Sequence, residues 1–75
     1  MKQRIFITGI SKGIGRAIAE DLNRKGFEVY GTSRSPEKIQ NKIEGVHYFE
    51  LDLSSENSIM KCVESLPEID LLVNN

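Results

Sequence analysis

Three glycines lie between a short apolar run and an amphipathic helical pattern near the start of the chain, in residues 8–15, Thr-Gly-Ile-Ser-Lys-Gly-Ile-Gly. Glycine permits a sharp turn, and it lets backbone N–H groups approach an anion with no Cβ in the way. Residues 4–8 predict a buried strand, and the residues after the glycines predict a helix. The apolar stripe expected on that helix consists of Ile14, Ala17, Ile18 and Leu22. Since a helix N-terminus carries free N–H donors and partial positive charge, this order predicts an anion-binding turn.

The glycine spacing is Gly-x-x-x-Gly-x-Gly, which differs from the common Gly-x-Gly-x-x-Gly fingerprint of dinucleotide-binding proteins. Lys12 precedes the second glycine instead of following it, so the P-loop of nucleoside triphosphatases is excluded. A dinucleotide is the natural ligand of such a loop at the first strand–helix turn of a doubly wound sheet.

Strand and helix patterns alternate along the rest of the chain. Further strands are expected at residues 27–32, 46–51 and 69–73. A short helix is expected at residues 36–42, and another runs from a cap at Ser54 or Ser55 to Pro67. The apolar face of the last helix is expected to comprise Ile59, Cys62, Val63 and Leu66. Gly26 is expected to end the first helix in a left-handed conformation.

This alternation predicts an α/β fold with the element order β-α-β-α-β-α-β and parallel strands. We expect the N-terminal half of a Rossmann-type doubly wound parallel sheet, with strand order 3-2-1-4. The chain has 75 residues, whereas a complete domain of this kind has about 150. Residues 1–75 are therefore expected to be the N-terminal part of a single dinucleotide-binding domain, truncated after the fourth strand. The first strand begins almost at Met1, which favours a natural N-terminus.

The composition argues against several other classes. Ten Lys and Arg against eleven Asp and Glu give a net charge of −1, so no global charge favours nucleic acid or an acidic membrane. No run is long and apolar enough for a membrane span or a signal peptide. The single cysteine, Cys62, excludes an internal disulfide and is expected in the core. His47 lacks other metal ligands at suitable spacing, so no metal site is predicted. A cytoplasmic location is expected.

Three motifs resemble the short-chain dehydrogenase/reductase family. Thr-Gly-x-x-x-Gly-x-Gly, continued through Ala19, is similar to the signature of this family. Asp52-Leu53 resembles its adenine-contacting pair, and residues 70–75, Asp-Leu-Leu-Val-Asn-Asn, resemble the start of its Asp-x-Leu-Val-Asn-Asn-Ala-Gly motif. The resemblance implies an oxidoreductase that transfers hydride between a nicotinamide cofactor and a small-molecule carbonyl or alcohol substrate. It also implies a homo-oligomer.

The end of the second strand distinguishes the two nicotinamide cofactors. NAD-specific sites carry an acid there, which accepts hydrogen bonds from the ribose hydroxyls. This chain has Thr32, Ser33 and Arg34 at that place, and Lys12 in the glycine loop. A guanidinium binds phosphate through a planar fork of donors, so NADP is predicted over NAD. The expected cofactor-binding residues are Gly9, Ser11, Lys12, Gly13, Ile14, Gly15, Ser33, Arg34, Asp52, Leu53 and Asn75.

The resemblance also implies catalysis by a serine and a Tyr-x-x-x-Lys pair. Tyr30 is followed four residues later by Arg34, and Tyr48 by Asp52, so neither tyrosine fits. No catalytic residue is expected within the chain, which should be inactive alone. Two alternatives stay open at this point. One is a non-catalytic dinucleotide sensor on the same fold, and the other is an isolated piece that binds nothing.

Overall fold

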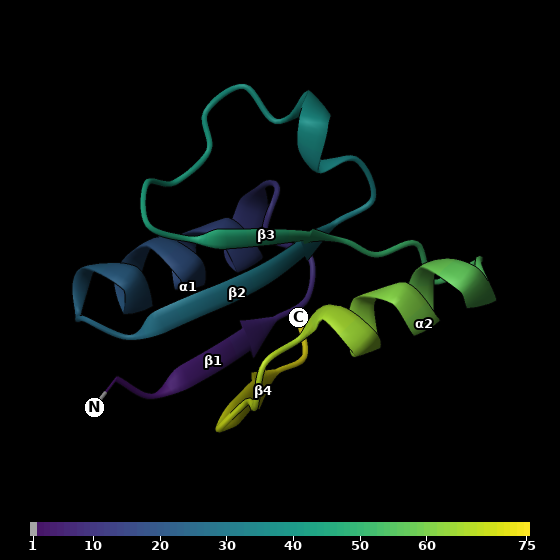
Figure 1. Cartoon of the computed structure of the whole chain (residues 1–75). Coiled ribbons are helices and arrows are strands. Elements are labelled where there is room, and N and C mark those ends of the chain that lie inside the picture. The colour runs from purple at the N-terminus through teal and green to yellow at the C-terminus, as the bar shows by residue number, and fades with distance from the viewer. Residues whose placement is uncertain (1) are drawn as a thin grey trace.

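The computed structural model describes residues 2–75 and contains one four-stranded parallel sheet in the order β3-β2-β1-β4. Figure 1 shows the strands side by side, with helices α1 and α2 on opposite faces of the sheet. The elements in chain order are β1 (Arg4–Ile7), α1 (Gly13–Arg24), β2 (Glu28–Ser33), the 3₁₀ turn η1 (Pro36–Lys38), β3 (His47–Glu50), α2 (Glu56–Ser65) and β4 (Leu71–Val73). The parallel sheet and its order confirm the predicted fold class.

Alternating side chains of the central strands supply two separate cores. Ile5, Ile7 and Val29 point to the α1 face, where they pack with Ala19. Phe6 and Tyr30 point to the other face and pack with Cys62 of α2. Because side chains alternate along a strand, β1 and β2 are covered on both faces, as expected of central strands in a parallel sheet.

Ile10 anchors the loop that follows β1. Its side chain is fully buried in the core on the α1 face. A Cβ at Gly31 of β2 would lie 2.0 Å from the Ile10 Cδ1 atom, so glycine at position 31 leaves the space that Ile10 fills. The glycine loop is thus attached to the sheet by an apolar side chain.

Helix α1 covers the sheet with a face that matches the predicted stripe only in part, since Ile18 and Leu22 pack against the core as expected. Gly15 and Ala19 are buried against the sheet, whereas Ile14 is 74% exposed and Ala17 is also exposed. The prediction for Ile14 and Ala17 was therefore wrong, because the two small residues let the helix backbone approach the sheet and set which face is covered. Gly26 follows the helix with φ +95, so the predicted left-handed residue is confirmed.

The predicted helix at residues 36–42 was also wrong, since only the single turn η1 forms. The residues just after this segment bond to α1 and β3. The N–H of Ile43 donates to the Tyr48 hydroxyl at 2.9 Å, and the side-chain amide of Asn23 donates to the carbonyl of Glu44 at 2.8 Å. These bonds hold residues 43 and 44, directly after the expected helix, in a non-helical conformation.

Helix α2 begins at a cap on Ser55, one of the two predicted positions, whose hydroxyl accepts from the N–H of Ser58 at 3.2 Å. Cys62 lies on the face of α2 that packs against the sheet, and burial raises the pKa of its thiol. Val63 is 63% exposed, contrary to prediction, because it lies about 100° around the helix from Cys62.

Strand β4 forms one edge of the sheet and is shorter than predicted. It pairs with β1 from Leu71 to Val73 only. Leu71 and Leu72 are exposed, as expected of an apolar strand at an open edge. Within residues 2–75, no helix has the length and apolar character needed to cross a membrane.

Candidate functional site

The glycine loop is fixed by Thr32 near the end of β2. The N–H of Gly9 donates to the Thr32 hydroxyl at 3.0 Å, and the N–H of Ile10 donates to the Thr32 carbonyl at 2.9 Å. Thr32 is only 3% exposed, so this buried hydroxyl is used entirely within the fold. The sequence did not predict this role of Thr32, because a threonine within a strand does not indicate that a distant loop will bond to it.

Two glycines of the loop have different structural tasks. A Cβ at Gly15 would lie 2.0 Å from the Gly9 carbonyl oxygen, so only glycine lets α1 begin this close to the loop. Gly13 has φ +67, and no atom lies within 4 Å of the place where its Cβ would be. The loop therefore packs closely on the helix at Gly15, whereas the space at Gly13 is open to a ligand.

Asn75 joins the end of β4 to the same loop. Its side-chain amide donates to the Gly9 carbonyl at 3.0 Å, and its N–H donates to the Thr8 hydroxyl at 3.0 Å. The segment after β4 thus helps to shape the loop that follows β1, although the two are far apart in the sequence.

Two adjoining clefts open at this carboxyl-terminal edge of the sheet. The first, which we call the basic cleft, has a volume of about 730 Å³. It is lined by Ser11, Lys12, Gly13, Arg16, Ser33, Arg34, Ser35, Lys38, Ile39, Gln40 and Asn41. The second, the Asp52 cleft, has a volume of about 560 Å³. It is lined by Thr8, Gly9, Ser11, Thr32, Ser33, Arg34, Leu51, Asp52, Leu53, Ser54, Asn74 and Asn75. Ser11, Ser33 and Arg34 line both clefts, so the two form one continuous surface.

Most of the predicted cofactor-binding residues line these clefts. Lys12 and Gly13 lie in the basic cleft, and four others lie in the Asp52 cleft, namely Gly9, Asp52, Leu53 and Asn75. Ile14 and Gly15 line neither cleft, since Ile14 faces outward from the first turn of α1 and Gly15 lies beneath Gly9. Arg16 and Lys38 line the basic cleft without having been predicted, because single basic residues in an expected helix resemble ordinary surface residues.

The Asp52 carboxylate is held in its charged form. Its Oδ1 atom accepts from the Ser54 hydroxyl at 2.6 Å and from the Ser54 N–H at 3.0 Å. These two hydrogen bonds, with a smaller contribution from the charge of Arg34, lower the pKa of Asp52 below its ordinary value. Asp52 can therefore accept a hydrogen bond from an amino group in this cleft.

The cations of the basic cleft lack carboxylate partners. Among residues 2–75, no carboxylate oxygen lies within 4.0 Å of the charged groups of Lys12, Arg34 or Lys38. Arg16 is the exception, since its Nε atom lies 3.3 Å from Glu20 one turn along α1. An open cleft with this charge distribution attracts an anion.

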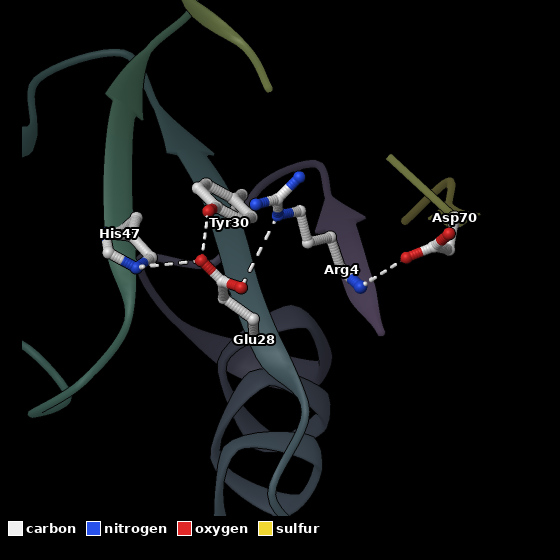
Figure 2. Close-up of polar contacts among 5 residues, drawn as sticks. All are labelled: Arg4, Glu28, Tyr30, His47 and Asp70. Atoms are coloured by element: carbon white, nitrogen blue, oxygen red, sulfur yellow. Dashed lines mark hydrogen bonds and ion pairs between the residues drawn. The ribbon is translucent and has the colours of Figure 1, made fainter. Parts of the chain in front are cut away.

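The amino-terminal edge of the sheet carries a different polar group, shown in Figure 2, which we call the amino-edge network. It consists of Arg4, Glu28, Tyr30, His47 and Asp70. Glu28 accepts a hydrogen bond from the Tyr30 hydroxyl and lies 3.4 Å from Arg4 and 3.8 Å from His47. An Asp70 oxygen accepts from the backbone N–H of Arg4 at 2.7 Å. The network therefore links the starts of all four strands.

Together, the parallel order β3-β2-β1-β4, the glycine loop between β1 and α1, and the clefts at the carboxyl edge define a Rossmann-type nucleotide-binding fold. The family model described as short chain dehydrogenase matches residues 3–75. The chain belongs to this family, as its motifs predicted.

Similar proteins are longer than this chain. A short-chain dehydrogenase/reductase of Pestalotiopsis microspora is 40% identical over 99% of this chain, which covers 28% of that protein. The 3-oxoacyl-[acyl-carrier-protein] reductase FabG of Buchnera aphidicola is 38% identical over 99% of this chain and 34% of its own length. The chain thus spans about a third of the length of these curated relatives.

Solved structures agree in fold. A short chain dehydrogenase from Burkholderia cenocepacia in complex with NADP has a TM-score of 0.86 and 25% identity, with 99% of this chain and 32% of that chain covered. A structure of ElxO with NADPH bound has a TM-score of 0.69 and 31% identity, with 100% of this chain and 35% of that chain covered.

Proposed function

We propose that this chain is the NADP-binding part of a short-chain oxidoreductase that transfers hydride between NADPH and a carbonyl or alcohol substrate. The observation that carries the proposal is the junction of the glycine loop with the two clefts, which share Ser11, Ser33 and Arg34. The bound cofactor would supply the hydride, and residues 1–75 would hold its adenosine and phosphate groups.

The residues present fit such a cofactor. The open space at Gly13, at the start of α1, admits a pyrophosphate to the N–H groups of the first helical turn. The Asp52 carboxylate, charged and partly exposed, suits the exocyclic amine of adenine. Leu53 is exposed beside it and offers an apolar surface to the base.

The preference for NADP rests on the charges around the adenosine ribose. The lining of the basic cleft contains no Asp or Glu, and Ser33 and Arg34 follow Thr32 where an NAD site carries an acid. Arg34 can bind a 2′-phosphate with two parallel N–H groups, and Lys12 can approach the same group from the loop. A site of this kind lacks the carboxylate that accepts hydrogen bonds from the ribose hydroxyls in NAD sites.

The positions of the two tyrosines support the absence of catalysis in this chain alone. The Tyr30 hydroxyl donates to Glu28, and the Tyr48 hydroxyl accepts from the N–H of Ile43 at 2.9 Å. Neither tyrosine lines the basic cleft or the Asp52 cleft. The proposal therefore places the acid/base tyrosine, its lysine and the orienting serine after Asn75, in a longer reading frame. A continuation with a serine and Tyr-x-x-x-Lys supports the enzyme, and a continuation without them favours a dinucleotide sensor.

The cofactor preference is tested by replacing Arg34. We expect Arg34→Ala to weaken NADP binding by about 1.5–3 kcal/mol, the size of a charge-assisted contact, and to leave NAD binding nearly unchanged. Isothermal titration with both cofactors measures the two affinities. Arg24→Ala, a change to an exposed cation on the last turn of α1, is the matched control and should alter neither. Equal losses of both cofactors in Arg34→Ala would overturn the assignment.

A further inference from the structure

Lys38 is the last residue of η1, and it lines the basic cleft together with Lys12 and Arg34. The helix predicted over residues 36–42 would have continued past Lys38. Instead, the turn ends at Lys38, and the backbone of Ile39 is extended. The irregular segment that follows gives the basic cleft its outer wall, including Gln40 and Asn41.

Local hydrogen bonds fix Lys38 relative to Arg34. The N–H of Ser35 donates to the Ser33 hydroxyl at 3.3 Å, and the N–H of Lys38 donates to the Ser35 carbonyl at 3.0 Å. The N–H of Ile39 then donates to the carbonyl of Pro36 at 3.1 Å. Pro36 further restricts the backbone, because its ring fixes φ. Short-range hydrogen bonds thus hold the backbone from Ser33 to Ile39, and both Arg34 and Lys38 of this segment line the basic cleft.

The charge on Lys38 is also available to a ligand. Two cations outside the cleft have partners, since the ammonium of Lys25 lies 3.0 Å from Asp21 and that of Lys42 lies 5.6 Å from the centre of the Tyr48 ring. Lys38 has no such ion pair among residues 2–75, and the same is true of Lys12 and Arg34. Three unpaired cations around one cleft repel one another, and a dianionic phosphate removes that repulsion.

We propose that Lys38 is a specificity-determining residue that, with Lys12 and Arg34, binds the phosphate monoester on the 2′ position of the adenosine ribose. This inference rests on the proposed NADP-binding function. It adds a third cation, supplied by the turn after β2, to the two expected from the sequence. Because an ammonium acts as a point charge, Lys38 contributes attraction to the phosphate without the two-pronged geometry of Arg34.

The test uses 2′-phospho-AMP and AMP, two probes that differ only in the 2′-phosphate. Their affinities are measured by titration at low salt for the unchanged chain and for Lys38→Gln. We expect Lys38→Gln to weaken 2′-phospho-AMP about three- to tenfold, the range of an exposed charged contact, and to leave AMP unchanged. Lys38→Arg should restore most of the loss. Lys42→Gln, which removes a cation from the same segment but outside both clefts, should change neither affinity.

The outcomes separate this inference from the function on which it rests. If Arg34→Ala weakens 2′-phospho-AMP selectively and Lys38→Gln does not, the role of Lys38 is overturned and the proposed function stands. If the unchanged chain binds 2′-phospho-AMP no better than AMP, the NADP preference itself fails. If Lys38→Gln and Lys42→Gln cause equal losses, general charge explains the effect and the inference is again overturned. Circular dichroism of each variant verifies that it is folded.

Discussion

The two edges of the sheet carry charged residues in opposite arrangements. At the amino-terminal edge, Glu28 lies beside Arg4 and His47, and the Asp70 carboxylate accepts from the Arg4 backbone N–H, so polar contacts join all four strands (Figure 2). At the carboxyl-terminal edge, Lys12, Arg34 and Lys38 line the basic cleft and have no carboxylate partner among residues 2–75. The charges at one edge thus serve the fold, and those at the other are available to a ligand.

The difference shows why similar residues have different roles at the two ends of one strand. Glu28, at the start of β2, forms an ion pair with Arg4 and accepts a hydrogen bond from the Tyr30 hydroxyl. Arg34, just after the end of β2, has no carboxylate partner within 4.0 Å among residues 2–75, and its charge contributes to the lowered pKa of Asp52 in the neighbouring cleft. Ligands of open parallel sheets bind at the carboxyl ends of the strands, so an unpaired charge at that edge can bind a ligand.

The largest effect on the carboxyl edge is expected from Gly15→Ala. The new Cβ would lie 2.0 Å from the Gly9 carbonyl oxygen, so the loop or the helix must shift. We expect a loss of about 1–3 kcal/mol in the free energy of unfolding, measured by urea denaturation, as for other overpacked sites. Nucleotide binding should be lost as well, because the carboxyl edge is displaced.

Gly13→Ala is the control for this variant. It adds the same atom to the same loop at a φ of +67, but with no neighbour within 4 Å. Only backbone strain is expected, at about 1 kcal/mol. If Gly15→Ala is no more destabilised than Gly13→Ala, close packing under Gly9 does not shape the loop.

A smaller effect is expected at the amino edge when the pH is lowered. The hydrogen bond from Tyr30 and the charge of Arg4 lower the pKa of Glu28 below its ordinary value of 4.5. The unfolded chain therefore binds the proton more readily than the folded chain does. The stabilisation from Glu28 is complete above pH 4.5 and is lost as the pH falls through the lower pKa of the folded state.

Glu28→Gln should remove this part of the acid dependence, measured as thermal midpoints between neutral and acidic pH. Its nucleotide binding should equal that of the unchanged chain, because the network lies at the far edge of the sheet. Glu64→Gln, at an exposed position of α2 without an ion pair among residues 2–75, should retain the full dependence. Identical pH profiles for Glu28→Gln and the unchanged chain would contradict the role given to the network.

The fold was largely predictable, because the apolar runs, the glycines and the serine cap are local signals. Strand order followed from the alternation of strands and helices, and it is confirmed. The errors came from tertiary contacts. The helix expected at residues 36–42 stops after one turn, and Ile43 and Glu44 directly after it bond to Tyr48 and Asn23. The packing face of α1 was set by the small residues Gly15 and Ala19, which carry a weak apolar signal.

The candidate site was predictable where a residue belongs to a contiguous motif. Lys12 and Arg34 stand out because one lies in the glycine loop and the other at the end of a strand. Lys38 and Thr32 do not, since their importance depends on a turn type and on a loop that folds back over β2. Such long-range pairings are visible only once the chain is folded.

The most direct test of the account maps where the nucleotide binds, by following backbone amide signals in NMR spectra during titration with 2′-phospho-AMP. We expect shifts in the glycine loop, in residues 33–38 and around Asp52. The signals of Arg4, Glu28 and His47 at the opposite edge should stay in place. Shifts centred on the amino-edge network, or no shifts at either edge, would contradict the claim that the carboxyl edge holds the cofactor.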